Sequence, residues 1–266
     1  MRQMKTQKWT GKLLTVVCLV LVLFPVFFIF LHSFAAGEEI EFFPQMLTLQ
    51  NWKKVLLWQP GYLVKFWISL GGAGMIVVGQ LVVSLFGAAA FSKYRFPGSG
   101  ICYFLLIVLM MMPVQVTLVP NYIVLNLFHL NGGWAALILP AVFLPFGTVF
   151  LTQIMRTIPD EILESARLDG AGTGRLLGCV LFPMVKGGAA CLAILNFADA
   201  WNMVEQPMIF LERPEQYPLS VFLAVTHGES AGSAFACGVL VLLPVLLLYL
   251  YYKEELLTGL AYSGVK

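Results

Sequence analysis

Long runs of apolar residues, separated by shorter polar stretches, dominate the sequence. A helix needs about 20 apolar residues to cross the hydrocarbon core of a membrane. Strict alternation of apolar and polar residues, as in a transmembrane β-barrel, is not seen. The pattern predicts an all-α polytopic membrane protein with six transmembrane helices, at residues 13–34, 63–91, 101–126, 133–153, 180–201 and 234–252.

The first run follows a basic start, as the apolar region of a signal peptide does. That region is only about 7–15 residues long and ends at a small-residue cleavage site, whereas this run is longer and has no such site. We therefore expect residues 1–12 to be a cytoplasmic N-terminus and residues 13–266 to form a single transmembrane domain. Prolines in the third run (Pro113, Pro120) predict a kinked helix, and Pro140 and Pro145 interrupt the fourth run.

Basic residues predict the orientation, because short cytoplasmic loops are enriched in Lys and Arg. If the N-terminus lies inside, four basic residues fall outside: Lys53, Lys54, Lys65 and Arg213. Twelve fall inside: Arg2, Lys5, Lys8, Lys12, Lys93, Arg95, Arg156, Arg167, Arg175, Lys186, Lys253 and Lys266. This asymmetry predicts that both termini are cytoplasmic.

Composition agrees with a membrane protein. The chain is 59% hydrophobic and 11% charged, against about 25% charged residues in soluble domains, which argues against a soluble enzyme and against a disordered chain. A net charge of +2 without a polybasic tract gives no sign of nucleic-acid binding. The five cysteines are scattered and are best interpreted as packing residues, with no expected metal site.

The inner loop at residues 156–186 is too long for a simple connection and should be structured. Pro159 suits the first position of a helix, and acidic residues follow in the first turn, where the helix dipole favours them. Gly170 and Gly172 should end this helix, and a second short helix should begin near Gly174. One face of the first helix is apolar: Ile162, Leu163 and Ala166.

Glycine-rich turns can also cradle phosphates. The dinucleotide spacing would require glycine where Arg175 stands, and the sequence contains no GxxxxGK[ST] motif. We therefore expect no nucleotide site in this chain. If ATP is used, another subunit binds it.

The same loop carries a family resemblance. Glu164-Ser165-Ala166, Gly170 and residues 180–183 (VLFP), with the spacing between them, resemble the EAA signature of permease subunits of bacterial ABC importers. Further positions resemble the carbohydrate branch, especially the maltose-type second permease subunit: residues 91–98, 112–113, 120, 158–159, 169–170, 201–202 and 259–266. Residues 67–70 (WISL) depart from the Asn-Ser-Leu that is common there.

The resemblance implies a permease subunit of an ATP-driven importer of sugars or oligosaccharides, without catalytic residues of its own. The first loop helix would be a coupling helix that docks on an ATPase subunit and transmits its closure to the membrane cavity. The residues implied in coupling are Glu164, Ser165, Ala166, Asp169 and Gly170. A helix lying passively on the membrane is the alternative, but such helices usually carry a Lys/Arg-rich face.

The resemblance also implies partners and a location. These are a second homologous permease, two cytoplasmic ATPase subunits that use ATP and Mg²⁺, and an extracellular or periplasmic solute-binding protein, together with membrane lipid, in the bacterial plasma (inner) membrane. No cofactor is expected on this chain. Alternatives are an ABC permease for another solute such as glycerophosphate or peptides, a proton-coupled secondary carrier, and an intramembrane hydrolase.

Asp199, near the end of the fifth run, is the one acidic residue that this topology leaves in or near the bilayer. A charge inside the membrane usually faces a cavity or a partner. With Asn196, Trp201 and Asn202 it would offer acceptors, donors and an aromatic plate to a sugar in the substrate path. Alternatively, Asp199 is hydrated at the outer interface and Trp201 belongs to the aromatic belt.

Overall fold

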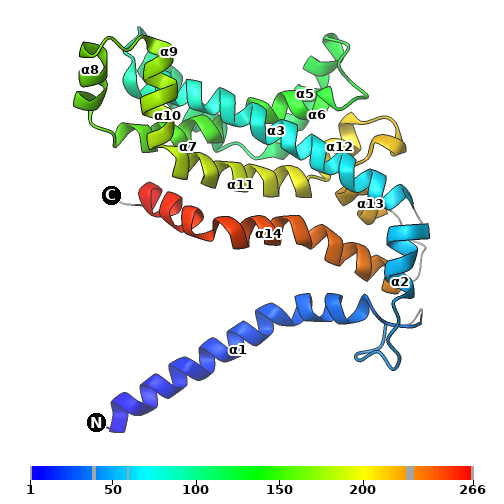
Figure 1. The fold of residues 1–266 in the computed structure, drawn as a ribbon. Helices are drawn as coiled ribbons and strands as arrows, with labels where there is room; N and C mark the ends of the chain where they lie inside the picture. The colour runs from blue at the N-terminus through cyan, green and yellow to red at the C-terminus, as the bar shows by residue number, and fades with distance from the viewer. Residues whose placement is uncertain (1, 38–39, 59, 226–230, 265–266) are drawn as a thin grey trace. The chain divides into compact units, whose positions relative to one another are not determined.

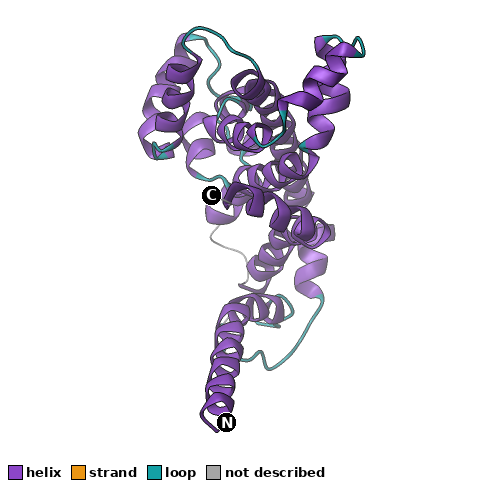
Figure 2. Ribbon diagram, turned by 90° about the vertical axis from the view of Figure 1, so that its left-hand side faces the viewer, coloured by secondary structure: helices purple, strands orange, loops and turns teal. Residues whose placement is uncertain are grey.

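The structure is a computed structural model that describes residues 2–37, 40–58, 60–225 and 231–264. It is about 80% helical, and within the described ranges it contains no strand, only an isolated bridge between Ala35 and Leu47 (Figure 2). The predicted all-α class is therefore confirmed. Residues 265–266, which end the predicted transmembrane domain, and parts of the predicted outer loops (38–39, 59 and 226–230) lie outside the described residues.

Helices of very different lengths follow one another along the chain (Figure 1). The α-helices are α1 (Arg2–His32), α2 (Gln50–Lys53), α3 (Pro60–Lys93), α4 (Ser99–Met110), α5 (Val114–Leu127), α6 (Ala135–Val142), α7 (Pro145–Arg156), α8 (Asp160–Leu168), α9 (Thr173–Arg175), α10 (Phe182–Met184), α11 (Lys186–Asn202), α12 (Glu205–Phe210), α13 (Leu219–Val225) and α14 (Ala231–Gly264). Two π-helical turns, η1 (Lys54–Trp58) and η2 (Leu176–Leu181), and the 3₁₀ turn η3 (Pro214–Gln216) connect them.

Four described helical segments are long and apolar enough to cross a membrane: Lys12–His32, Gly61–Lys93, Ala135–Arg156 and Ala231–Glu254. Two more candidates are bent pairs of helices, α4 with α5 and the Thr173–Met184 segment with α11. The described residues therefore provide four spans, or up to six if each bent pair counts as one. This range agrees with a multi-pass membrane protein.

The third predicted span is more strongly bent than its sequence indicated. The axes of α4 and α5 meet at 109°, so residues 101–126 do not form one kinked helix. Pro113 lies at the junction with an extended backbone (ψ 141°), and proline has no N–H to continue a helical ladder. Pro120, in contrast, is accommodated inside α5.

The fifth predicted span is also divided. The bend of 74° between the Thr173–Met184 segment and α11 lies at Val185, which leaves the helical region at φ −100° and ψ 10°. The helix α11 therefore begins at Lys186 and not at residue 180, and residues 180–184 belong to the segment before the bend. In the fourth span Pro145 begins α7, as expected from the lack of an N–H on proline.

The chain divides into two compact units, Met1–Val64 with Leu223–Pro244 and Lys65–Phe222 with Val245–Lys266. In the first unit, Asn51 forms hydrogen bonds with the segment after α1. Its Nδ2 donates to the carbonyls of Ser33 (3.2 Å) and Ala35 (2.8 Å). Phe28 and Phe235 meet edge to face with centroids 6.0 Å apart. These contacts join α1, α2 and the start of α14.

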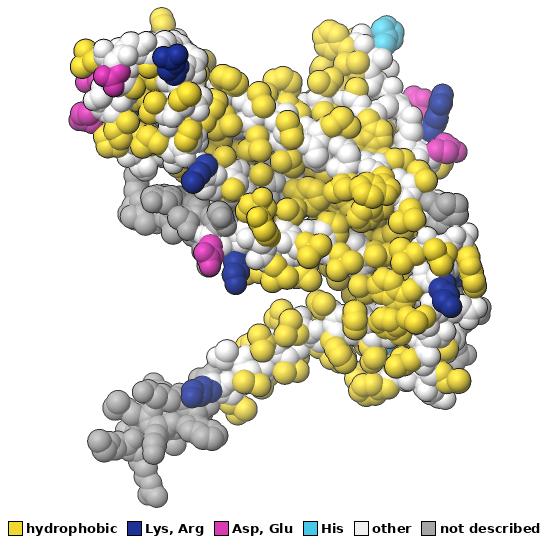
Figure 3. All heavy atoms as spheres, in the orientation of Figure 1, with side chains coloured by type: hydrophobic (Ala, Val, Ile, Leu, Met, Phe, Trp, Pro, Cys, Tyr) yellow, Lys and Arg dark blue, Asp and Glu magenta, His cyan; other side chains and the backbone are white. Residues whose placement is uncertain are grey.

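The second unit is organised around α3, α7 and α11. Its larger apolar cluster contains buried residues of these helices, of α8 and of η2: Ala88, Ala89, Phe150, Leu151, Ile154, Met155, Ile158, Leu163, Leu176, Leu181, Val185, Cys191, Leu192 and Ile194. A second cluster joins α5, α6 and the end of α12. Between charged ends, the face of this unit that Figure 3 shows is mostly hydrophobic, as expected of a surface that faces lipid.

Glycines allow α3 to approach α6 and α7 closely. A Cβ at Gly72 would overlap the indole ring of Trp134, one at Gly79 would lie 2.6 Å from Val142 Cγ2, and one at Gly87 would lie 2.9 Å from Thr148 Cγ2. Spacings of seven and eight residues place the three glycines on one face of the helix. Small residues at such positions are a common means of packing helices in lipid.

Substitution of Gly72 tests this packing. Gly72→Ala should lower the melting temperature of the detergent-solubilised protein, because displacing a packed ring typically costs about 1–3 kcal/mol. Gly71→Ala is the matched control, since a Cβ at Gly71 meets no atom within 4 Å. Equal melting temperatures of the two variants would contradict the proposed close approach.

Candidate functional site

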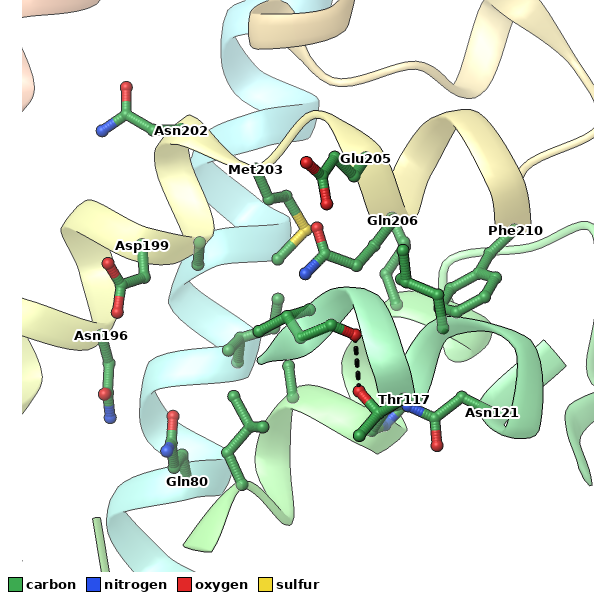
Figure 4. Close-up of a pocket in the computed structure, with 18 of the residues that line it drawn as sticks. Gln80, Thr117, Asn121, Asn196, Asp199, Asn202, Met203, Glu205, Gln206 and Phe210 are labelled. Atoms are coloured by element: carbon green, nitrogen blue, oxygen red, sulfur yellow. Dashed lines mark hydrogen bonds between the residues drawn. The ribbon is translucent and has the colours of Figure 1, made fainter. Parts of the chain in front are cut away.

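A cavity of about 530 Å³ lies in the second unit and is lined by α3, α5, α6, α11 and α12 (Figure 4). This volume is typical of small-molecule sites, which span roughly 300–1,000 Å³. Apolar residues form part of the wall, including Ile76, Leu118 and Phe210. Two breaks in the helical chain border the cavity: Pro113 precedes α5, and Met203, with an extended backbone, separates α11 from α12.

The polar lining is rich in amides and contains two carboxylates. Its polar side chains are Gln80, Gln115, Thr117, Asn121, Asn196, Asp199, Asn202, Glu205 and Gln206. The described lining includes no Lys, Arg or His. The cavity can therefore donate and accept hydrogen bonds, but the charged side chains that line it are negative.

Asn196 and Asp199 present two of these groups from one side of α11, because residues three apart share a helix face. Asn196 is only 4% exposed, and its Nδ2 lies buried without a hydrogen-bond partner among the described residues. A buried donor without a partner is costly. A bound solute with an accepting oxygen would satisfy it. Figure 4 shows Asp199 beside Asn196 at the edge of the cavity.

The other two predicted path residues behave differently. Asn202 lines the cavity, although its Nδ2 donates to the carbonyl of Ala198 one turn earlier (2.8 Å). Trp201 is 2% exposed and is not part of the lining; its ring contacts Phe66 edge to face (5.5 Å) and stacks on Phe197 (5.6 Å). Trp201 therefore packs between α11 and α3, outside the lining of the cavity.

Several lining residues were missed by the sequence interpretation. Gln80 and Asn121 lie inside predicted spans, and Gln115 donates to the carboxylate of Glu205 (3.1 and 3.3 Å). Their signal was present as uncharged polar residues within apolar runs. The candidates predicted from the sequence were confined to the neighbourhood of Asp199, although amides buried in the other spans also need hydrogen-bond partners.

The predicted two-helix loop is confirmed by α8, a turn at Gly170 and the segment from α9 to α10. Gly170 has φ 81°, a left-handed conformation that favours glycine after a helix. Pro159 precedes the helix as its N-cap and is not its first residue, since its ψ of 140° is not helical. Acidic Asp160 and Glu161 occupy the first turn, as predicted.

Only part of the predicted apolar face of α8 is covered. Leu163 is 4% exposed within the larger cluster, whereas Ile162 is 38% exposed. Glu164, Ser165, Asp169 and Gly170 are exposed, and Ala166 is half-buried. Leu168 is 88% exposed, and exposed apolar side chains gathered on one element often mark a contact with another protein.

Lys93, the last residue of α3, holds the start of α8. Its Nζ donates to the carbonyl of Ile158 (2.6 Å) and to Oδ1 of Asp160 (2.7 Å), and its side chain is only 4% exposed. The hydrogen bond and charge of Lys93 lower the pKa of the Asp160 carboxyl below its ordinary value. Charged residues gather at this end of the unit (Figure 3).

Comparison with known proteins decides the family. Residues 80–253 match the family described as the inner membrane component of binding-protein-dependent transport systems. The chain belongs to this family. It is a permease subunit of a transporter complex and not itself an enzyme. A secondary carrier or an intramembrane hydrolase is thereby set aside.

Curated relatives and a solved structure agree with this assignment. The chain is 26% identical over 260 residues to the arabinooligosaccharides transport system permease protein AraQ of Halalkalibacterium halodurans, covering 92% of each chain. It is 28% identical over 206 residues to the sn-glycerol-3-phosphate transport system permease protein UgpE of Yersinia enterocolitica, covering 73% of each.

The solved structure is that of a bacterial ABC transporter involved in the import of the acidic polysaccharide alginate. The match has a TM-score of 0.86 at 20% identity and covers 96% of this chain and 98% of that one. At this level of identity the match supports the fold. It agrees with the all-α permease architecture predicted from the sequence.

The Asp160 contact gives a pH-dependent prediction. Because the pKa of Asp160 is lower in the folded protein than its ordinary 3.8, the folded state binds fewer protons there. The resulting stabilisation is present above that value and is lost as the pH falls through the folded pKa. Asp160→Asn should therefore lower the melting temperature slightly at pH 7. Melting curves of both proteins should converge below pH 3.8, and a difference that is independent of pH would contradict the ion pair.

Proposed function

We propose that this subunit forms part of the path of an ATP-driven importer for uncharged sugars or oligosaccharides. The observation that carries the proposal is the cavity, whose polar lining contains amides, a hydroxyl and two carboxylates but no basic side chain among its described residues. Sugar hydroxyls both donate and accept hydrogen bonds, so this set of groups matches them. The arabinooligosaccharide relative supports the same class of solute.

A phosphorylated solute is the second candidate, because the relative UgpE serves sn-glycerol-3-phosphate. Phosphate recognition generally uses Arg, Lys or a helix N-terminus. Asp199 and Glu205 would instead repel an anion, and that repulsion strengthens where the surroundings are poor in water. The cavity therefore favours the uncharged solute over the phosphate.

The complete transporter would contain a second homologous permease, two ATPase subunits and a solute-binding protein. ATP and Mg²⁺ would be bound by the ATPase subunits, and this chain would bind neither. The family description, which names a binding-protein-dependent system and an inner membrane component, supports this assembly. The excess of basic residues on one side supports cytoplasmic termini and an α8 that faces the cytoplasm.

Coupling would run through α8, seated in the ATPase subunit. Glu164, Ser165 and Asp169 are exposed and available to polar partners, while Leu168 offers an apolar contact. Ala166 is small and half-buried, and Gly170 permits the sharp turn that follows the helix. The buried Leu163 ties this contact surface to the larger apolar cluster, so α8 can move as a rigid body with its surroundings.

Asp199→Asn tests the cavity. Loss of the carboxylate should weaken uptake of a neutral oligosaccharide by about tenfold, the usual effect of losing a hydrogen bond to a charged group. It should also relax discrimination against glycerophosphate, because one repulsive charge is removed. Competition uptake in proteoliposomes of the assembled complex measures both effects. The control is Glu212→Gln, which removes an exposed carboxylate outside the cavity. Unchanged transport of both solutes would refute the assignment.

Glu164→Lys tests coupling. A basic or polar ATPase group opposite Glu164 would then face a positive charge, and like charges at an interface can reduce binding by more than about a hundredfold. Uptake should be lost while the subunit still inserts into the membrane, as measured by transport and by the amount of protein in washed membranes. Glu212→Lys is the matched charge reversal and should transport normally. Normal uptake by Glu164→Lys would remove Glu164 from the coupling surface.

A further inference from the structure

The contact between Lys93 and the start of α8 links α8 to α3, the helix that also lines the cavity. Lys93 ends α3, a helix of 34 residues without an internal proline. Thirteen residues earlier, the same helix contributes the buried Gln80 to the cavity. At 1.5 Å per residue the two positions are about 20 Å apart along the helix axis. A displacement of α8 can therefore be transmitted to the cavity through α3, which is a single continuous helix.

The position of Lys93 is unusual for a lysine. A buried lysine is rare unless its ammonium group is paired, and here Nζ donates to the Ile158 carbonyl and to the Asp160 carboxylate, both at the start of α8. The C-terminal end of a helix favours a positive charge, so α3 itself stabilises the ammonium group. Asp160 is exposed and also lies near Arg95 and Arg167.

We propose that Lys93 is a positioning residue that fastens α8 to α3, so that a displacement of α8 moves the cavity wall at Gln80. This inference rests on the proposed coupling role of α8. Two contacts then attach α8 to α3. Lys93 forms an ion pair with Asp160 in the first turn of α8. Leu163 packs in the apolar cluster that also contains Ala88 and Ala89 of α3. Two separated attachments prevent the helix from pivoting about either one.

A distance measurement tests the attachment without a known solute. Spin labels at the exposed positions Glu161 in α8 and Val82 in α3 are introduced into the assembled transporter, in a background whose native cysteines are replaced and whose ATPase activity is retained. With Lys93 present, the distribution of distances between the two labels should stay narrow, and its mean should stay constant through the ATP cycle. With Lys93→Met it should broaden or shift between nucleotide states. An unchanged distribution in that variant would overturn the proposal.

A second readout is the amount of solute imported per ATP hydrolysed. Lys93→Met should lower this ratio by about tenfold, as expected when a charge-assisted hydrogen bond is lost, with ATPase activity retained. Lys186→Met, which removes an exposed lysine at the start of α11, should leave the ratio unchanged. Equal ratios in Lys93→Met and wild type would also overturn the proposal.

Variants of the exposed partner cover the case in which Lys93→Met fails to assemble. Asp160→Asn keeps an oxygen acceptor and should lower the ratio less than Asp160→Ala does. If neither changes the ratio or the label distance, Lys93 is merely structural and the proposal is wrong.

The two hypotheses fail differently. If the wild-type complex imports no sugar but the label distance depends on Lys93, the proposed solute is wrong and the attachment stands. If sugar is imported and the distance ignores Lys93, the attachment is wrong and the proposed function stands.

Discussion

The second unit depends on the close approach of α3 to α6 and α7. Because lipid does not drive apolar helices together as water does, helices in a membrane gain stability from close packing. Gly72, Gly79 and Gly87 remove the side chains that would hold the helices apart. The resulting contact allows α3 to form one wall of the cavity while it remains a single rigid helix. Without that contact, the polar side chain of Gln80 would not be brought opposite α5 and α11.

Straight and broken helices have complementary roles around this contact. The helix α3 is long and has no internal proline, whereas the chain bends sharply at Pro113, before α5, and at Val185, before α11. Irregular backbone at membrane depth is tolerated where it is buried in protein or lines a cavity. The polar lining is accordingly concentrated on α5, on the end of α11 and on α12. The N-terminal end of α3 is fixed too, since the buried Lys65 donates to the carbonyls of Pro214 and Glu215 (both 2.6 Å).

The few charges of the chain are used in distinct ways. Lys65 and Lys93 are largely buried and fix the two ends of α3 to neighbouring segments. Under the proposed function, the acidic residues of the cavity would discriminate by charge, because a carboxylate accepts hydrogen bonds from hydroxyl groups but repels anions. The exposed charges of α8 remain available to a partner. A low overall charge content is compatible with all three roles, since each depends on the position of a side chain and not on a net charge.

The sequence by itself determined the helical class, the multi-pass membrane character and the two-helix loop with its turn at Gly170. These follow from local properties: runs of apolar residues, the missing N–H of proline and the backbone freedom of glycine. It also identified Asn196, Asp199 and Asn202 as cavity candidates. Only the tertiary structure decided that Trp201 packs between α11 and α3, that α4 and α5 meet at 109°, and that Lys93 reaches Asp160. Each of these depends on a contact between residues distant along the chain or on the direction of a side chain, which hydrophobic patterning does not encode.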